Sequence, residues 1–565
     1  MKRSKAILAI SLAAAMMFSV AGCGGAPAEQ TSQDQPATNQ EGQASQEGSE
    51  AGGNETKEME VGQDAAGGEG GAVTEKPEGI QPGTEFTYWT NTDYPSHLPW
   101  MDNAAAQLQY NLYDNLLYRY HADSSDVRGN IAESWEVSED GLVWVFKIKD
   151  NVTFTNGNKV TAEAFVKTWD AAKAYQPRYF NVVDKYEATG ELELTVTLKA
   201  ASPTFIYELP MQPGVGVVDP ALLEEYGPED NRAAVGCGPY YLDEYVSGER
   251  IVLKANPNYH NPDRAPSIET CKLEVIPDMN TALMGLMSGQ LDCMNTADME
   301  IVSSLVDSGW EPIAYPARVH PWWFNAREVE IFKDPVVREA LCHMIDWDAV
   351  NDLVYNGRYI KLESYWAGPG EVPYGDGYKY DPQLGVQMLE DAGYSKDDIA
   401  FTIEVNPDFV SQITAVIAQF TELGFTKIEM ETYDMSTCLG MIKNGTYHMT
   451  TTHNGYSEEN PLTPYDMGLI PEGTQRIMWM DQMDEAAQAA YEEALQHREA
   501  ALKCANFDDF VVEVEAITKL CQDNYCALGG LQRVGFYGVN PDFSGVYIGT
   551  GTGYLEFCYL YSNVE

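Results

Sequence analysis

The chain has 565 residues, and its 86 acidic against 35 basic side chains give a formal net charge of −51. A negative charge of this size repels phosphate groups, so it argues against nucleic acid and anionic lipid surfaces as partners. The length is enough for several domains with substantial hydrophobic cores.

The first 22 residues are predicted to be a lipoprotein signal peptide. A short basic start is followed by an apolar run over residues 6–20, which is short for a membrane span of about 20 residues. The segment VAGC, ending at Cys23, resembles the bacterial lipobox, in which cleavage precedes a lipid-modified cysteine. The resemblance implies that Cys23 carries acyl chains, and two such chains give stable anchoring in a bilayer. An ordinary signal peptide with an incidental cysteine is the alternative.

Residues 23–82 are predicted to be a disordered linker that follows the anchor. The segment is dominated by Gly, Ala, Gln, Ser and Glu and has no aromatic residue. Such a composition buries too little apolar surface to offset the conformational entropy of the chain. As a flexible coil it would span about 40–45 Å. A spacer and plain filler both predict disorder, and the anchor favours the spacer.

Strands are predicted next from alternating apolar residues. Residues 141–157 alternate and turn, which predicts a β-hairpin with arms at 143–145 and 152–154 and with Gly157 at positive φ. Residues 191–200 place apolar side chains at every second position, which predicts a half-buried strand.

Helices are predicted from caps and from apolar residues at helical spacing. Asp334 and Asp381 each stand before a proline that opens an amphipathic stretch, and Gly393 closes the second one. Residues 508–522 form a further amphipathic helix. Because helices and strands follow in no strict alternation, several α/β lobes are expected.

Nine cysteines remain after Cys23, and they show neither CxxC spacing nor a metal-ligand pattern. Most stand among apolar residues, so buried inert thiols are expected. A bridge between Cys521 and Cys526 is possible, although nothing in the sequence supports it. No metal and no cofactor is predicted.

A run of motifs resembles the bacterial extracellular solute-binding proteins, family 5, which include the oligopeptide- and dipeptide-binding proteins of ABC importers. Residues 110–120 read YNLYDNLLYRY, and residues 129–171 read GNIAESWEVSEDGLVWVFKIKDNVTFTNGNKVTAEAFVKTWDA. The elements that follow in family order are VGCGPYYLDEYVSGERIVLKANPNYHNP, ALMGLMSGQLDCM, FNAREVEIFKDPVVREALCHMID and DPQLGVQMLEDAGY. Each match alone is weak, but together they cover nearly all of the chain from Glu85 onward.

This resemblance implies an α/β fold: a two-lobed, periplasmic-binding-protein-like clamp (type II) with an additional third domain inserted near the N-terminus. In the family, solute bridges two lobes and stabilises a closed form that a membrane permease recognises. The implied domains are lobe I (83–98, 216–318 and 528–565), the extra domain (99–215) and lobe II (319–527).

The resemblance also directs attention to three segments that could contact solute. The first follows the first strand, the second begins lobe II, and the third corresponds to the family segment that runs beside bound peptide. The predicted contacts are Trp89, Asn91, Thr92 and Asp93; Trp322 and Trp323; and His453, Asn454, Gly455, Tyr456, Ser457 and Glu458. Ordinary loop packing is the alternative for each segment.

One departure bears on the solute. Peptide-binding members often carry an Asp for the peptide ammonium, but Ser457 stands at that position here, and Glu458 or Glu459 could supply the charge instead. A small peptide is the leading hypothesis because it is the frequent ligand in the family that the chain resembles, and an oligosaccharide or another small polar solute is the second.

Other classes of protein receive less support. No GxSxG, HExxH or P-loop motif is present, so a surface-anchored hydrolase is a remote alternative, and an adhesin or signalling receptor is another. The sequence thus predicts a monomeric binding protein that works with ABC permease subunits. It would be exported and lipid-anchored to the cell membrane, on the extracellular face or in the periplasm.

Overall fold

The computed structural model describes residues 76–101, 106–120, 123–362, 378–451, 460–471, 473, 475–504, 506–548 and 553–564. The chain divides into two compact units, residues 1–59 and 60–565, and all described residues belong to the second. The predicted signal peptide, Cys23 and almost all of the predicted linker lie outside the described residues.

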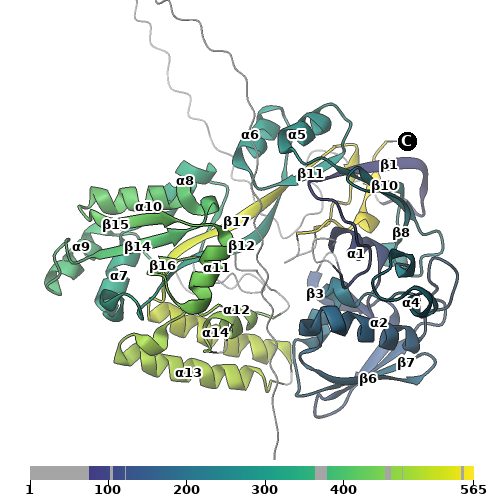
Figure 1. Cartoon of the computed structure of the whole chain (residues 1–565), viewed down its shortest axis with the longest axis horizontal. Helices are drawn as coiled ribbons and strands as arrows, with labels where there is room; N and C mark the ends of the chain where they lie inside the picture. Colours follow the sequence, from purple (N-terminus) through teal and green to yellow (C-terminus); the bar gives the residue numbers. More distant parts are fainter. Residues whose placement is uncertain are drawn as a thin grey trace, which may run out of the picture. The chain divides into compact units, whose positions relative to one another are not determined.

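Eleven strands of the described part form one mixed sheet (Figure 1). Its order is β15 (Lys427–Thr432), β14 (Ala400–Val405), β16 (Met449–Thr450), β12 (Ile313–Phe324), β17 (Ala527–Val539), β11 (Cys293–Thr296), β1 (Gln81–Thr90), β10 (Ile268–Val275), β9 (Arg250–Ala255) and β8 (Tyr240–Val246), with β13 (Ile360–Lys361) also paired to β17.

Smaller sheets and many helices accompany this sheet. The small sheets pair β4 (Ala132–Val137), β5 (Val143–Ile148), β7 (Glu193–Leu198) and β6 (Val183–Gly190); β2 (Leu117–Tyr120) with β3 (Asp123–Gly129); and β18 (Phe543–Ser544) with β19 (Tyr561–Ser562). The α-helices are α1 (Ala106–Leu112), α2 (Ala162–Tyr175), α3 (Phe205–Met211), α4 (Pro220–Tyr226), α5 (Met279–Met287), α6 (Met299–Asp307), α7 (Pro335–His343), α8 (Trp347–Tyr355), α9 (Pro382–Asp391), α10 (Val410–Glu422), α11 (Met435–Asn444), α12 (Thr463–Gly468), α13 (Glu485–Ala501) and α14 (Phe507–Asp523).

The two longest strands, β12 and β17, pair antiparallel in the middle of the large sheet. Glycines in β17 allow this pairing to be close. A Cβ atom at Gly535 would lie 2.2 Å from the Tyr315 ring, and one at Gly530 would lie 2.1 Å from the His320 carbonyl oxygen. Because real Cβ atoms do not approach other atoms so closely, a larger residue at either position would push the strands apart.

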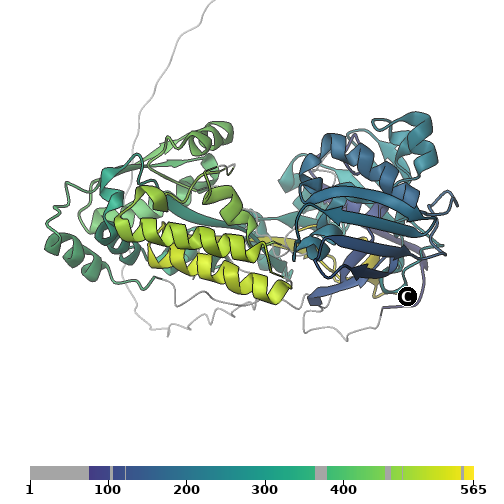
Figure 2. The same ribbon diagram turned by 90° about the horizontal axis from the view of Figure 1, so that it is seen from below.

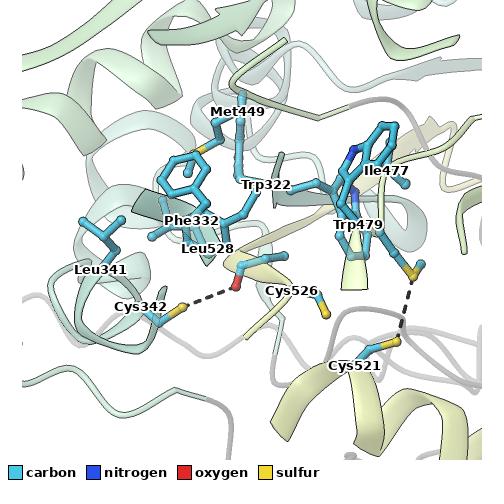
Figure 3. Packing of buried hydrophobic residues seen from close by; sticks show 14 of the residues in the cluster. Trp322, Phe332, Leu341, Cys342, Met449, Ile477, Trp479, Cys521, Cys526 and Leu528 are labelled. Atoms are coloured by element: carbon cyan, nitrogen blue, oxygen red, sulfur yellow. Dashed lines mark hydrogen bonds between the residues drawn. The ribbon is translucent and has the colours of Figure 1, made fainter. Parts of the chain in front are cut away.

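Buried apolar side chains form three cores. Core 1 contains Phe86, Trp100 and Trp169; core 2 contains Trp322, Trp323, Tyr447 and much of the segment after residue 319; and the small core 3 packs Trp89 against α5 and α6. Figure 3 shows part of core 2, with aromatic, aliphatic and sulfur-bearing side chains in one cluster. The strands β12 and β17 contribute side chains to both core 1 and core 2.

The four-stranded sheet is packed against α2 (Figure 2, in blue). Its strand β7 alternates between buried and half-buried residues, so the predicted half-buried strand is confirmed. The predicted hairpin is wrong, because β5 is already paired on both edges, with β4 and β7. Residues 152–160 instead fold on themselves, with Val160 N donating to Val152 O at 3.0 Å. The positive φ of Gly157 is confirmed at 90°.

The predicted helix caps are confirmed. Asp334 accepts a hydrogen bond from Val336 N at the start of α7, and Asp381 accepts one from Leu384 N at the start of α9. Gly393 follows α9 with φ +87°. The helix predicted over residues 508–522 corresponds to α14.

All cysteines from Cys237 onward are free, and all of them except the half-buried Cys504 are buried. This agrees with the expectation of buried thiols. Cys342, Cys521 and Cys526 are visible in Figure 3. The Cys342 thiol donates to Ala527 O, and the Cys521 sulfur lies 3.7 Å from the Met480 sulfur.

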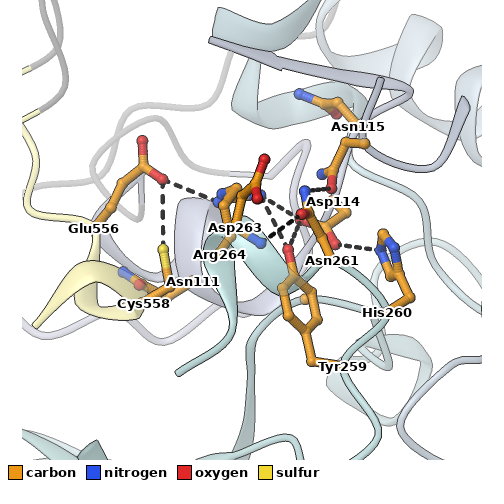
Figure 4. Close-up of polar contacts among 12 residues, drawn as sticks. Asn111, Asp114, Asn115, Tyr259, His260, Asn261, Asp263, Arg264, Glu556 and Cys558 are labelled. Atoms are coloured by element: carbon orange, nitrogen blue, oxygen red, sulfur yellow. Dashed lines mark hydrogen bonds and ion pairs between the residues drawn. The ribbon is translucent and has the colours of Figure 1, made fainter. Parts of the chain in front are cut away.

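A buried polar network joins distant parts of core 1 (Figure 4). Arg264 Nη1 donates to Asp114 Oδ1 at 2.8 Å, and Nη2 donates to Glu556 Oε2 at 3.0 Å. His260 Nε2 lies 2.9 Å from the other oxygen of Asp114, and Tyr259 donates its hydroxyl to Asp114 at 3.1 Å. A single guanidinium thus connects the segment after α1 with the C-terminal segment.

Lys76, the first residue that the structure describes, is held by two hydrogen bonds. The Lys76 ammonium donates to the carbonyl oxygens of Ala265 and Cys558, each at 2.7 Å. These bonds hold the chain against core 1 before β1 starts. The predicted domain boundaries stay a prediction.

Candidate functional site

Two strands of the large sheet have parallel neighbours on both sides. Strand β1 lies between β10 and β11, and β14 lies between β15 and β16. In open α/β sheets, ligands bind beyond the carboxyl ends of parallel strands where the chain connections diverge. Two of the three predicted segments follow the carboxyl ends of strands that have a parallel neighbour. Residues 91–93 come directly after β1, and residues 453–458 come shortly after β16 in the sequence.

At the end of β1, the predicted residues differ in exposure. Trp89 is 3% exposed, belongs to core 3 and donates its indole N–H to Ile276 O at 2.9 Å. Asn91 and Thr92 are exposed, and the Thr92 hydroxyl donates to Asn91 Oδ1 at 3.0 Å. The two polar side chains are therefore accessible to a ligand, whereas Trp89 has a structural role in core 3.

Asp93 fixes the turn between β8 and β9. Its Oδ2 accepts hydrogen bonds from the Tyr245 hydroxyl and the Ser247 hydroxyl, both at 2.9 Å, and from Gly248 N at 3.0 Å. Burial opposes ionisation, but the hydrogen bonds from Ser247, Tyr245 and the backbone outweigh it and lower the pKa of Asp93. The carboxylate is thus already engaged by the protein.

Both predicted tryptophans of β12 are fully buried in core 2, at 0% exposure. The Trp322 ring meets the Phe409 ring edge-on, with 5.5 Å between the centroids. No described residue accepts a hydrogen bond from Trp322 Nε1, and such a buried donor costs about 1–3 kcal/mol when it is unpaired. This N–H is the feature that keeps Trp322 a candidate for contact with solute.

Residues His453 to Glu458 lie outside the described residues. The described residue before this stretch, Thr451, is buried, and its hydroxyl donates to Pro321 O at 2.7 Å. After the stretch, Asn460 Nδ2 donates to Glu208 Oε1 at 2.9 Å. Both flanks are therefore held by the fold, and the contacts predicted for the stretch stay predictions, as do those at residues 89–93 and 322–323.

The sequence reasoning missed the segment that follows β14. Residues 406–409 leave the carboxyl end of this strand, and the Phe409 ring lies 4.8 Å from the His320 ring as well as against Trp322. A usable signal was present, because the alternating strand ends in Asn-Pro, a pair that favours a turn.

Glu404 lies in the same strand, and its carboxylate is buried. The hydrogen bonds that its Oε2 accepts come from neutral backbone groups. The backbone N–H groups of His448 and Met449 donate to this oxygen at 3.0 and 3.3 Å. Burial raises the pKa of Glu404 to about 7, because these hydrogen bonds compensate only in part for the lost hydration.

In the part of the chain that the structure describes, no three His, Cys, Asp or Glu side chains gather into a group that could hold a metal ion. Within the same residues, no helix combines the length and the apolar content that a membrane crossing requires. The arrangement offers hydrogen-bonding groups at strand ends, which is chemistry suited to holding a polar solute.

A family model decides the assignment. The model described as "Bacterial extracellular solute-binding proteins, family 5 Middle" matches residues 126–475. The chain belongs to family 5. This confirms the resemblance deduced from the motifs, and family 5 consists of binding proteins, not enzymes.

Two curated relatives of this family 5 protein come from Escherichia coli strain K12. A probable D,D-dipeptide-binding periplasmic protein is 28% identical over 275 residues, which is 46% of this chain and 51% of the relative. A glutathione-binding protein is 28% identical over 273 residues, which is 47% of this chain and 52% of the relative. The matched region thus spans about half the length of the curated relatives.

A solved structure extends the likeness. The Brucella suis protein NikA in complex with Fe(III)-EDTA has a TM-score of 0.72 and 20% identity, and the match covers 85% of this chain and all of that one, 100%. At this identity the likeness concerns the fold. It confirms the predicted α/β, two-lobed binding-protein fold for this family 5 protein.

Proposed function

We propose that the chain is the lipid-anchored solute-binding component of an ABC importer, which captures a small peptide and delivers it to a membrane permease. The match of the family 5 model to residues 126–475 is the observation that carries this proposal. The protein would act as a monomer outside the cytoplasm, on the extracellular face or in the periplasm, with Cys23 in the bilayer.

The strand pair β12–β17 supports a closing motion. Both strands contribute to core 1 and to core 2, so bending within this pair would move one core relative to the other. Solute drives closure only through its higher affinity for the closed form, about 1.4 kcal/mol for each tenfold shift in population. The proposed lobes are 83–98, 216–318 and 528–565 for lobe I and 319–527 for lobe II, with 99–215 as the extra domain.

The names of the relatives support a peptide as solute. One relative is named for D,D-dipeptides and the other for glutathione. An oligosaccharide or another small polar solute is the second candidate. The structure of NikA with Fe(III)-EDTA supports it, because that protein of similar fold holds a ligand that is not a peptide.

Identification of the solute is the direct experiment. The full chain, purified gently from its host, should release short peptides that mass spectrometry detects after denaturation. A single sugar would favour the second candidate. Turnover of added peptides or glycans by the pure protein would contradict the proposal and favour a hydrolase.

The predicted contact segment can be tested separately from the fold. Tyr456→Ala should weaken binding of the co-purified solute about tenfold, with an unchanged melting temperature, as measured by calorimetric titration and thermal unfolding. Tyr380→Ala is the matched control, because Tyr380 is 47% exposed and is not among the predicted solute contacts. Equal affinity for both variants would remove Tyr456 from the site.

Trp322 and Trp323 are unsuitable for such a test. Both are fully buried, so replacement by Ala is expected to cost about 3–5 kcal/mol of stability, and a loss of binding could not be told from unfolding. Trp322→Phe keeps most of the packing and removes the unpaired indole N–H, which makes it the sharper variant for this position.

The anchor has its own test. Cys23→Ala should move the protein from the membrane fraction to the soluble fraction of its host, because the diacyl chains would have no thiol to join. Intact-mass measurement of the wild-type protein should show the added lipid. An unmodified Cys23 would leave solute binding possible and remove the anchor.

A further inference from the structure

Helix α3 packs in core 1 and also contacts residues of core 2. Leu209 of this helix is buried in core 1, whereas Leu462 and Phe510 belong to core 2. From the same helix, Glu208 accepts the hydrogen bond of 2.9 Å from Asn460. One position earlier, the Tyr207 ring lies 4.4 Å from the Phe507 ring, measured between centroids. The helix thus makes two contacts with residues that lie beside the second core, Asn460 and Phe507.

Asn460 is held in the orientation that this contact needs. Its Oδ1 accepts from Leu462 N at 3.1 Å, and its backbone oxygen accepts from Thr463 N at 3.0 Å, where α12 starts. These bonds direct Nδ2 toward Glu208. On the other side, the Thr204 hydroxyl donates to the same Glu208 oxygen at 2.6 Å. Burial raises the pKa of Glu208, as expected for a carboxylate from which the contact excludes water.

We propose that Glu208 and Asn460 form a latch that holds α3 of core 1 against residues beside core 2, and that by joining these parts it favours the closed form of the protein without contacting solute. The inference rests on the proposed function, and it makes both residues positioning residues. Asn460 comes two residues after Glu458, the last predicted solute contact, so the latch fixes one flank of that segment. Because α3 lies within residues 99–215, the latch gives the predicted extra domain a role in closure.

The size of the effect follows from the worth of one hydrogen bond. A net contribution typical of such bonds changes an equilibrium by about 2- to 10-fold. Loss of the latch should reduce the ratio of closed to open protein by that factor. Since apparent affinity scales with the competent fraction, solute affinity should fall by up to the same factor.

The sharpest variant is Asn460→Asp. It keeps the oxygen that accepts from Leu462 N, so the start of α12 is preserved, but it places a carboxylate against Glu208. The full chain without added solute should then show a larger radius of gyration in X-ray scattering. Hydrogen exchange at the amides of α3 should also become faster.

A second substitution should restore the contact. In the double variant Glu208→Gln with Asn460→Asp, the Gln amide can donate to the Asp carboxylate, so the radius should return to the wild-type value. Glu208→Gln alone keeps an acceptor for Asn460 and should resemble the wild type. Glu229→Gln is the matched control, since Glu229 accepts from Tyr175 and not from core 2.

Two results would overturn the latch. One is a scattering profile of Asn460→Asp that equals that of the wild type. The other is an expanded Asn460→Asp protein that the double variant does not restore, because that would indicate a merely structural role for Asn460. The scattering experiment needs no solute, so it tests the latch separately from the proposed function. If the variants scatter as expected but the protein binds no solute, the latch stands and the proposed function is wrong.

Discussion

Asp114 and Glu404 are both buried carboxylates, yet the pKa of one is lowered and that of the other is raised. At Asp114, burial opposes ionisation, but the hydrogen bond with His260 and the charge of Arg264 outweigh it. At Glu404, burial prevails over two backbone N–H donors, and the pKa rises to about 7. The difference is the nearby cationic partner, since the two backbone donors at Glu404 do not replace its lost hydration.

Glu556 lies between these two cases. It shares Arg264 with Asp114, but burial still raises its pKa, because one guanidinium serves two carboxylates. The network in Figure 4 therefore stabilises Asp114 as an anion more strongly than it stabilises Glu556. Replacement of Arg264 removes the cation beside Asp114, and replacement of Glu404 removes the carboxylate that has no cationic partner. Both substitutions therefore test the difference between the two carboxylates.

Removal of the cation should have the largest effect. Arg264→Met leaves Asp114 and Glu556 buried without it and should cost about 3–5 kcal/mol of stability at pH 7. The pH dependence attributable to Asp114 should reverse. In the wild type the lowered pKa gives stability that is lost as pH falls, whereas in the variant a raised pKa gives stability that is lost as pH rises.

Urea unfolding at several pH values measures this change. The control is Arg232→Met, because Arg232 pairs with Asp230 at the surface and exposed pairs contribute little. Equal losses in both variants would mean that the buried network does not determine the charge of Asp114.

Neutralisation of Glu404 should have an intermediate effect that depends on pH. The folded pKa of about 7 exceeds the ordinary 4.5, so the folded state binds more protons between these values, and stability falls as pH rises through this window. Glu404→Gln should remove about 1–2 kcal/mol of the difference in unfolding free energy between pH 5 and pH 8, less than the full shift would give, because the carboxylate keeps some hydration.

The matched control for Glu404 is Glu429→Gln, on the adjacent strand β15 and exposed. This variant should keep the wild-type pH dependence. If Glu404→Gln also keeps it, then Glu404 is ionised in the folded protein near pH 6, and the contrast with Asp114 fails.

Asp93 should give the smallest effect. It is held by neutral donors, like Glu404, but it is only half-buried and accepts from two hydroxyls as well as from the backbone, and its pKa is lowered. Asp93→Ala should cost about 1 kcal/mol near neutral pH through the lost hydrogen bonds to the β8–β9 turn. The loss should shrink as pH falls below 3.8, the ordinary pKa of the group, because the wild type then loses the same contribution. Thermal unfolding of both proteins at pH 7 and pH 3 tests this.

Local patterns predicted local structure well. The caps at Asp334 and Asp381 and the strand β7 follow from short-range rules, and each is present. The hairpin at 141–157 failed because pairing is decided by competition for strand edges, and β7, which lies far along the chain, occupies the second edge of β5. No periodicity within residues 141–157 carries that information.

Within the candidate site, the position of a segment was easier to predict than the exposure of its side chains. The position of Asn91 and Thr92 beyond β1 was predictable from strand order in the family. The burial of Trp322 and Trp323 was not, because an apolar pair in a strand can face a core on both sides of a sheet. Phe409 was missed because its partners, His320 and Trp322, are remote in sequence.

The bonds of Lys76 to Ala265 and Cys558 would bear mechanical load under the anchor proposed at Cys23. If the chain before Lys76 is pulled, the load passes through two backbone carbonyls on separate segments before it reaches β1. Strand β1 lies inside the large sheet, paired on both sides, so force along the tether would shear an interior strand instead of peeling an edge strand. Such an attachment would resist tension applied through the proposed anchor and would keep the fold intact under that load.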